Sequence, residues 1–255
     1  MSWLERDGVR LAYELHGQDR AGQPVLLTHG YGASRRMWAP NLLALAGRGP
    51  TVAWEMRGHG DSDAPDDPAL YSHELSLGDM EAVLTVMGAP TAVLIGMSLG
   101  GFLSLAFNLR HPERVTGLVL VDTGPGFRSQ EARERWNSWA RDRADRLEAG
   151  GMEALPGGSE QRRAAHIHGA QGLAHAARGM LVQQDGAVFE SLAQIAVPTL
   201  VVVGSEDAQF LAAADVMEKR IPEARKVVLP GAGHAANMDA PEEFNAVVAD
   251  FLEGL

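Results

Sequence analysis

The sequence predicts an α/β fold with a mostly parallel, doubly wound sheet of about eight strands, helices on both faces and a helical insertion. Two observations predict it. Short apolar runs alternate with helix-like segments over both ends of the chain, and consecutive parallel strands require such crossovers. A length of 255 residues, 45% of them hydrophobic, also suffices for the core of one large domain.

The first half of the chain is expected to open with a hairpin and then to alternate strand and helix. Residues 9–16 alternate apolar and polar side chains after the turn-like Asp7-Gly8, which is typical of two short paired strands. Buried strands are then expected at 24–28, 51–54, 91–95 and 115–121, and helices at 38–46, 75–87 and 99–110.

The same alternation returns near the end of the chain, after a segment without it. Strands are expected at 198–203 and 225–229, and helices at 207–220 and 241–252. The segment between has no convincing strand, but it contains arginine-rich helical stretches such as 131–148. The expected organisation is a core of residues 1–122 and 191–255 and a helical cap insertion of residues 123–190.

Composition and charge exclude several classes of function. A formal net charge of −11 disfavours nucleic acid and anionic membrane surfaces as partners. The absence of cysteine excludes disulfides, a thiol nucleophile and thiolate metal sites. No apolar run of about 18 residues occurs, and the first ten residues lack the apolar segment of an export signal, so a cytoplasmic protein is expected.

No metal or other cofactor is expected. His166 and His168 are spaced i, i+2, which puts them on different sides of a helix, unlike the i, i+4 pair of a zinc helix. The glycine-rich loops lack the Lys-Ser/Thr of a phosphate-binding loop, and no dinucleotide-binding pattern follows the first strand.

The segment Gly96-Met97-Ser98-Leu99-Gly100 lies where an apolar, strand-like run ends and a helix-like segment begins. A sharp turn from strand to helix strains the backbone of the serine, and side chains two residues on either side of it would collide. Chance produces about 0.15 such patterns in a chain of this composition, so the surrounding strand and helix decide the interpretation. We predict that Ser98 is a nucleophile.

A nucleophilic serine needs a base and a group that orients the base. His234 and Asp207 each follow an expected strand near the end of the chain. In a parallel sheet, these side chains and Ser98 emerge at the same carboxyl edge, where α/β sheets bind ligands. Asp122 also follows an expected strand and is the competing acid.

The order of these residues along the chain carries a resemblance to a known family. Ser98, Asp207 and His234 occur in the order nucleophile, acid, base, and the chain resembles the α/β-hydrolases over essentially its whole length. Residues 123–190 fall where that family carries its cap. The resemblance supports Asp207 over Asp122 as the acid.

Two further motifs belong to the resemblance. Residues 29–32, His-Gly-Tyr-Gly, resemble the family's oxyanion loop, which implies that the backbone N–H groups of Tyr31 and Leu99 hold the oxyanion. Residues 57–62 resemble the turn after the following strand. Glu55 departs from the pattern, because similar chains more often have Asp there, and we interpret it as structural.

The other histidines are less suited to act as the base. His29 is expected to brace the oxyanion loop, and His16 ends a strand. Three histidines are expected to lie away from Ser98, and the three in the insertion are expected to face solvent. The first group is His59, His73 and His111, and the second is His166, His168 and His175.

The substrate pocket is expected between Ser98 and the insertion. Besides Tyr31, its predicted lining residues are Met97, Phe127, Trp136 and Met180. Together they favour a small-molecule substrate with an apolar acyl or alkyl group. Haloalkane dehalogenases and epoxide hydrolases, which the resemblance also covers, use a carboxylate where this chain has serine, so their chemistry is disfavoured.

The predicted function is hydrolysis of a small carboxylic ester, lactone or thioester through an acyl-enzyme on Ser98. Two other reactions use the same residues: cleavage of a carbon-carbon bond in a dienoic keto acid, and perhydrolysis. A ligand receptor of the same fold with little turnover is the alternative from another class. Measured turnover distinguishes it from an enzyme.

Overall fold

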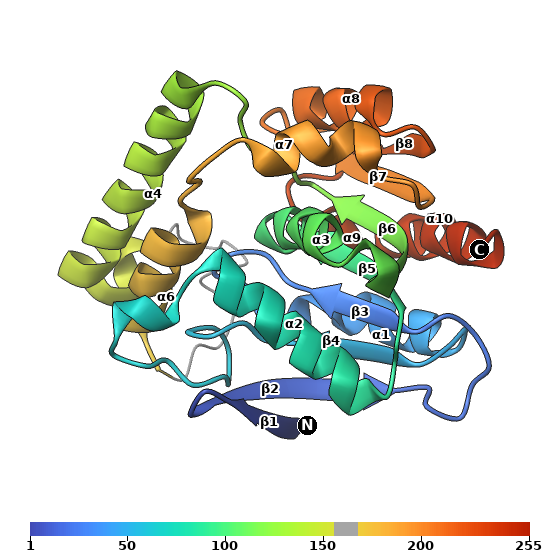
Figure 1. The fold of residues 1–255 in the computed structure, drawn as a ribbon, viewed down its shortest axis with the longest axis horizontal. Helices are drawn as coiled ribbons and strands as arrows, with labels where there is room; N and C mark the ends of the chain where they lie inside the picture. Colours follow the sequence, from blue (N-terminus) through green and yellow to red (C-terminus); the bar gives the residue numbers. More distant parts are fainter. Residues whose placement is uncertain (156–167) are drawn as a thin grey trace.

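The computed structural model describes residues 1–155 and 168–255, and its central sheet has eight strands, as the sequence predicts (Figure 1). Their spatial order is β1-β2-β4-β3-β5-β6-β7-β8. β1 and β2 form an antiparallel hairpin, β2 pairs antiparallel with β4, and every pair from β4 to β8 is parallel. The strands are β1 (Ser2–Arg6), β2 (Val9–His16), β3 (Val25–Thr28), β4 (Thr51–Trp54), β5 (Ala92–Met97), β6 (Val115–Val121), β7 (Thr199–Gly204) and β8 (Ala224–Leu229).

The central strands are buried on both faces, which explains why their sequences are unbroken apolar runs. Every residue of β3, β5 and β7 is buried. Because side chains alternate along a strand, Leu94 belongs to one hydrophobic core, while its neighbours Val93 and Ile95 belong to the other. The sheet therefore has a separate core on each face.

Helices cover both cores (Figure 1). Side chains of α2 (His73–Met87), α3 (Leu99–Arg110) and α8 (Leu211–Arg220) pack in the first core. Those of α1 (Ala39–Ala46) and α10 (Pro241–Glu253) pack in the second. The shorter elements are α9 (Ala236–Asp239) and the 3-10 turns Arg35–Trp38, Pro68–Leu70, Pro112–Arg114, Gly151–Ala154 and Leu192–Gln194. The doubly wound arrangement is confirmed.

One difference from the expected helix bounds concerns a candidate site residue. The sequence predicts a helix from residue 207, but α8 begins at Leu211. Residues 207–210 instead form a turn, in which the Phe210 N–H donates to the Asp207 carbonyl oxygen at 3.0 Å. Asp207 therefore lies in the loop directly after β7 and not on a helix.

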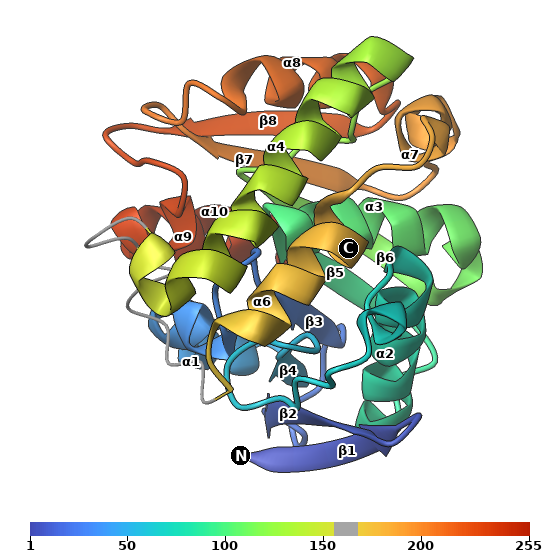
Figure 2. The same cartoon turned by 90° about the vertical axis from the view of Figure 1, so that its left-hand side faces the viewer.

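Between β6 and β7, the described residues form helices and no strand. They are α4 (Gln130–Gly150), α6 (Ala170–Ala176), a π-helical turn (Ala177–Leu181) and α7 (Ala187–Ser191). Figures 1 and 2 show α4 and α6 side by side, across the end of the sheet. A helical insertion is thus present where the sequence predicts one. None of the helices in the described ranges combines the length and apolar character that crossing a bilayer demands.

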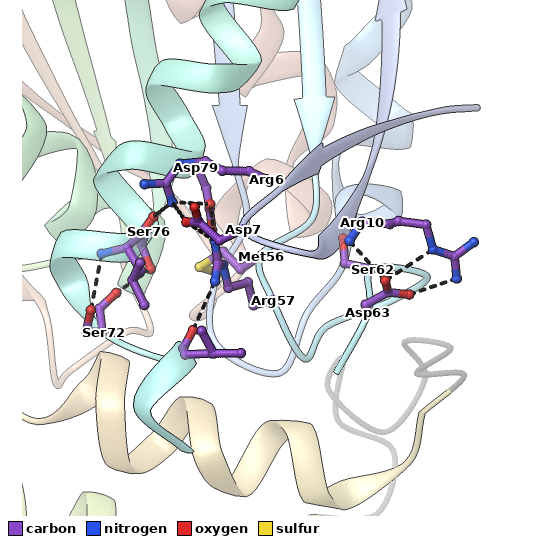
Figure 3. A network of polar contacts seen from close by, with 12 residues as sticks. Arg6, Asp7, Arg10, Met56, Arg57, Ser62, Asp63, Ser72, Ser76 and Asp79 are labelled. Carbon is purple, nitrogen blue, oxygen red and sulfur yellow. Dashed lines mark hydrogen bonds and ion pairs between the residues drawn. The ribbon is translucent and has the colours of Figure 1, made fainter. Parts of the chain in front are cut away.

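A buried ion pair fastens the turn after β4 to helix α2 (Figure 3). Arg57 is fully buried, and its Nε and Nη2 donate to the two carboxylate oxygens of Asp79 at 2.7 and 2.8 Å. Arg6 of β1 donates to the same carboxylate at 3.0 Å. The bidentate pair and the Arg6 contact together join three segments that are distant in sequence.

Replacing Asp79 with asparagine is expected to lower the free energy of unfolding by about 3–5 kcal/mol, because the buried Arg57 charge loses its bidentate carboxylate and keeps only a 3.4 Å contact with the half-exposed Asp7. Chemical denaturation measures the change. Asp63→Asn is the matched control, since the Arg10–Asp63 pair in Figure 3 is open to solvent and contributes little. Equal losses in the two variants would contradict the assignment of a structural role to the buried pair.

Candidate active site

Ser98 lies at a sharp turn between β5 and α3. Its backbone torsions, φ 52° and ψ −116°, fall outside the regions that L-residues favour. A Cβ on Gly96 would come within 2.2 Å of the Gly100 carbonyl oxygen, and a Cβ on Gly100 would come within 2.2 Å of the Thr28 carbonyl oxygen. The close approach of these backbones explains both glycines of the motif.

The imidazole of His234 lies between Ser98 and Asp207. Its Nε2 is 3.1 Å from Ser98 Oγ, and its Nδ1 is 2.8 Å from Asp207 Oδ2. Because an ionised carboxylate only accepts hydrogen bonds, Nδ1 carries the proton and Nε2 presents its lone pair to the serine hydroxyl. Phe210 stacks on the imidazole, with 5.0 Å between ring centres and 19° between planes. These contacts hold the ring in the orientation a base requires.

Asp122 has a different set of contacts from those of Asp207. Its two carboxylate oxygens accept the N–H groups of Gly204 and Ala236, each at 2.8 Å. Gly204 ends β7 just before the loop that carries Asp207, and Ala236 opens α9 just after the loop that carries His234. Burial raises the pKa of the Asp122 carboxyl to about 6, and the two hydrogen bonds oppose that rise. Of the two acids that the sequence offers, Asp207 is therefore the one that meets the imidazole, while Asp122 joins the loops behind it.

The predicted oxyanion loop passes directly over the serine. A Cβ on Gly30 would lie 2.7 Å from the Met97 sulfur and 3.3 Å from the Ser98 Cβ. His29 braces this loop, as expected: its Nδ1 donates to the Gly30 carbonyl at 2.7 Å, and its Nε2 accepts from the Met56 N–H at 3.0 Å. The Leu99 N–H opens α3, so it has no acceptor within the helix.

A cavity of about 300 Å³ opens in front of Ser98 and His234. The four pocket residues predicted from the sequence all line it, together with Tyr31 of the oxyanion loop. They are Met97, Phe127, Trp136 and Met180. Within the described ranges, no three His, Asp or Glu side chains are grouped so that they could hold a metal ion.

Sequence reasoning missed several residues of the cavity wall. Trp139 and Arg143 of α4 line it, and they lie three and seven residues after Trp136, which is the spacing of one helix face. That spacing was a usable signal. Phe102 and Gln183 also line the cavity, but their sequence neighbourhoods contain no comparable pattern.

The family of the chain follows from the match of its sequence to a family profile. The profile described as "Alpha/beta hydrolase family" matches residues 25–247, which is most of the chain. The chain belongs to the alpha/beta hydrolase family. The fold, the turn at Ser98 and the order of the candidate residues agree with this membership.

The names of individual relatives of this alpha/beta hydrolase give several different activities. A putative 2-succinyl-6-hydroxy-2,4-cyclohexadiene-1-carboxylate synthase from Bacillus subtilis is 30% identical over 98% of this chain and 97% of its own. A 3-oxoadipate enol-lactonase from Acinetobacter baylyi is 25% identical over 98% and 96%. A thermophilic esterase structure from Thermogutta terrifontis has a TM-score of 0.83 at 27% identity and covers 100% of this chain and 99% of its own.

Glu55, which departs from the usual pattern of the family, is fully buried. Its carboxylate accepts the backbone N–H groups of Arg35 and Asp61 at 3.2 and 2.7 Å, and it pairs with the Arg35 guanidinium at 2.7 Å. Burial raises its pKa, and those partners oppose the rise. These contacts agree with the structural interpretation of Glu55.

Of the histidine predictions, the one for His175 is wrong, because helices of the insertion pack onto the core and bury it. His59 lies beside the oxyanion loop, with its ring centre 5.7 Å from that of Tyr31. The Nε2 of His73 is 2.6 Å from the Met180 carbonyl oxygen, and neither His59 nor His73 lines the cavity in front of Ser98. His175 is buried and not solvent-facing. His168 is exposed as expected, and the prediction for His166 lies outside the described residues.

Proposed function

We propose that this alpha/beta hydrolase is a serine hydrolase that cleaves a small carboxylic ester, lactone or thioester through an acyl-enzyme. Ser98 is the nucleophile, His234 the base and Asp207 the acid that orients it. Residues 123–190 act as the cap over a core of residues 1–122 and 191–255. The hydrogen-bonded line from Ser98 Oγ through His234 to Asp207, at the base of the cavity, is the observation that carries this proposal.

In the first half of the reaction, the Ser98 oxygen attacks the carbonyl carbon while His234 Nε2 takes the hydroxyl proton. The carbonyl oxygen becomes an oxyanion, which accepts hydrogen bonds from the Tyr31 and Leu99 amides. Asp207 accepts from Nδ1–H and stabilises the imidazolium that forms. The tetrahedral intermediate then collapses, and His234 returns the proton to the departing alcohol or thiol.

In the second half, water attacks the acyl carbon of the ester on Ser98, and His234 Nε2 accepts a proton from that water. The same two amides stabilise the second oxyanion. Collapse releases the carboxylic acid, and the proton on His234 restores the Ser98 hydroxyl. The cycle consumes one water and needs no further reagent.

The cavity supports a small, partly apolar substrate. Its volume of about 300 Å³ matches a small ligand, and its wall is rich in aromatic and methionine side chains. Relatives named as an enol-lactonase and an esterase support ester or lactone cleavage.

Covalent labelling tests the proposal. A fluorophosphonate is expected to add one mass equivalent to the protein, and peptide mapping is expected to find it on Ser98, because only an activated serine reacts rapidly with this reagent. Ser98→Ala is expected to take up no label. A label on another residue, or equal labelling of the variant, would contradict the proposed nucleophile.

A synthase-type reaction is the second candidate, because a relative named as a synthase is 30% identical over nearly the whole chain. Such an enzyme would keep a reactive Ser98 but leave simple esters intact. Assaying one preparation with both the fluorophosphonate and a panel of short esters separates the two. Labelling without ester hydrolysis favours the synthase, and labelling with hydrolysis favours the esterase.

A further inference from the structure

One cation stands out in the wall of the substrate cavity. Among the described residues that line it, Arg143 is the only lysine or arginine, and none is aspartate or glutamate. Most of the others are aromatic, aliphatic or glycine. A guanidinium in such a wall gives the cavity one place where an anionic group of a substrate can be bound.

Arg143 lines the same cavity as Ser98 and His234 and contacts the side chain of Tyr31. The residue lies on α4 of the insertion, and its guanidinium carbon is 5.2 Å from the ring centre of Tyr31 and 5.6 Å from that of Trp139. Tyr31 supplies one of the two proposed oxyanion amides. The guanidinium thus lies beside the side chain of a residue whose backbone amide is a proposed oxyanion donor.

The aromatic surroundings keep the guanidinium in place. A guanidinium is attracted to aromatic rings, and its planar fork of N–H groups matches the two oxygens of a carboxylate. The Tyr31 hydroxyl donates to the Leu173 carbonyl at 2.8 Å, which fixes one of the two rings. Burial raises the pKa of Tyr31 and the nearby Arg143 lowers it, as a cation beside the hydroxyl must.

The charge of the whole protein makes a local cation more significant. With a net charge of −11, the overall field repels anions. An anionic substrate therefore depends on an attractive group inside the cavity itself.

We propose that Arg143 binds a carboxylate of the substrate, so that the natural substrate is an ester or lactone carrying a carboxylate in addition to its scissile bond. This inference rests on the proposed function and narrows its substrate class. Trp136 and Trp139, on the same face of α4, contact the apolar part of the substrate between the two polar ends.

Matched pairs of esters test the inference. One pair carries the charge on the acyl side: 4-nitrophenyl hydrogen glutarate and 4-nitrophenyl hexanoate. The other carries it on the leaving group: 4-carboxyphenyl acetate and 4-methylphenyl acetate. In at least one pair, the parent is expected to favour the anionic ester in kcat/KM by about ten- to a hundredfold, the range of a charge-assisted hydrogen bond.

Substitutions assign that preference to one side chain. Arg143→Met keeps a long apolar stem and is expected to abolish the preference mainly through a higher KM for the anionic ester, while the neutral ester is turned over as before. Arg143→Lys is expected to restore part of the preference, because the charge returns without the planar fork. Arg141→Met, an exposed position on the same helix, is the control and is expected to match the parent.

The possible outcomes distinguish a failure of this inference from a failure of the proposed function. If Arg143→Met lowers kcat/KM equally for both members of each pair, Arg143 only packs the insertion on the core and the inference is overturned. The same holds if the parent hydrolyses neutral esters in a Ser98-dependent way without favouring the anionic ones. Ester hydrolysis that is absent, or that survives in Ser98→Ala, overturns the proposed function instead.

Discussion

Replacing Ser98 with alanine is expected to lower kcat/KM for every ester that the protein hydrolyses by about 10⁴-fold or more. The substitution removes the oxygen that forms the acyl-enzyme, while His234, Asp207 and the two backbone amides stay in place. Residual activity would come from water held against the oxyanion donors. Steady-state kinetics with 4-nitrophenyl esters, on protein freshly purified from a host without the parent enzyme, measures the loss.

The control for this variant is a serine of α3, the helix that follows Ser98. Ser104 is buried, its hydroxyl donates to the Gly100 carbonyl at 2.8 Å, and it does not line the cavity. Ser104→Ala is expected to keep kcat/KM within a few-fold of the parent, since a neutral hydrogen bond contributes only about 1 kcal/mol. If Ser98→Ala kept a tenth or more of the parent activity, Ser98 would not be the nucleophile.

Asparagine substitution at the two candidate acids is expected to have very different effects on turnover. Asp207→Asn should lower kcat by about 10⁴-fold, because an amide at this position favours the imidazole tautomer that cannot accept the Ser98 proton. Asp122→Asn should lower kcat far less. Its side chain touches the backbone of the two loops and keeps one acceptor for either Gly204 or Ala236.

The unfolding temperature of Asp122→Asn tests the same assignment in a second way. One of the two buried amides loses its acceptor, so a lower stability than that of the parent is expected at pH 4. The folded-state pKa of Asp122, about 6, lies above its ordinary value of 3.8, so its contribution to stability is full below about pH 4 and is lost as the pH rises through 6. The difference in unfolding temperature between parent and variant is therefore expected to become smaller from pH 4 to pH 7.

The relative loss of turnover in the two variants decides which aspartate orients His234. A large loss of turnover in Asp122→Asn with a small one in Asp207→Asn would reassign the acid to the end of β6. A gap in stability that widens with pH would contradict the raised pKa of Asp122. Circular dichroism of each variant shows that the loss of turnover occurs in folded protein.

Much of the architecture was predictable because it depends on local pattern. Unbroken apolar runs identified the buried strands, and the doubly wound sheet followed from their alternation with helices. The glycines around Ser98 could be explained before the structure, since a sharp turn tolerates no side chain at those positions. The errors in helix bounds came from local turn chemistry, as at residues 207–210.

Packing between distant segments was not predictable in the same way. Asp122 and Asp207 each follow a parallel strand, so pattern alone left both as candidates. The fold separates them, because the Asp122 carboxylate is used by two backbone amides while Asp207 reaches the imidazole. His175 of the insertion was expected to face solvent for a related reason, since its burial depends on how the insertion packs on the core.

From its sequence, this chain could be recognised as an alpha/beta hydrolase with Ser98, Asp207 and His234 as candidate residues, because strand ends and chain order are encoded locally. The contact of Ser98 with His234, the role of Asp122 behind the loops, and the place of Arg143 in the cavity depend on residues far apart in sequence. Such contacts form only when the sheet and insertion pack together, so the three-dimensional structure was needed to assign them.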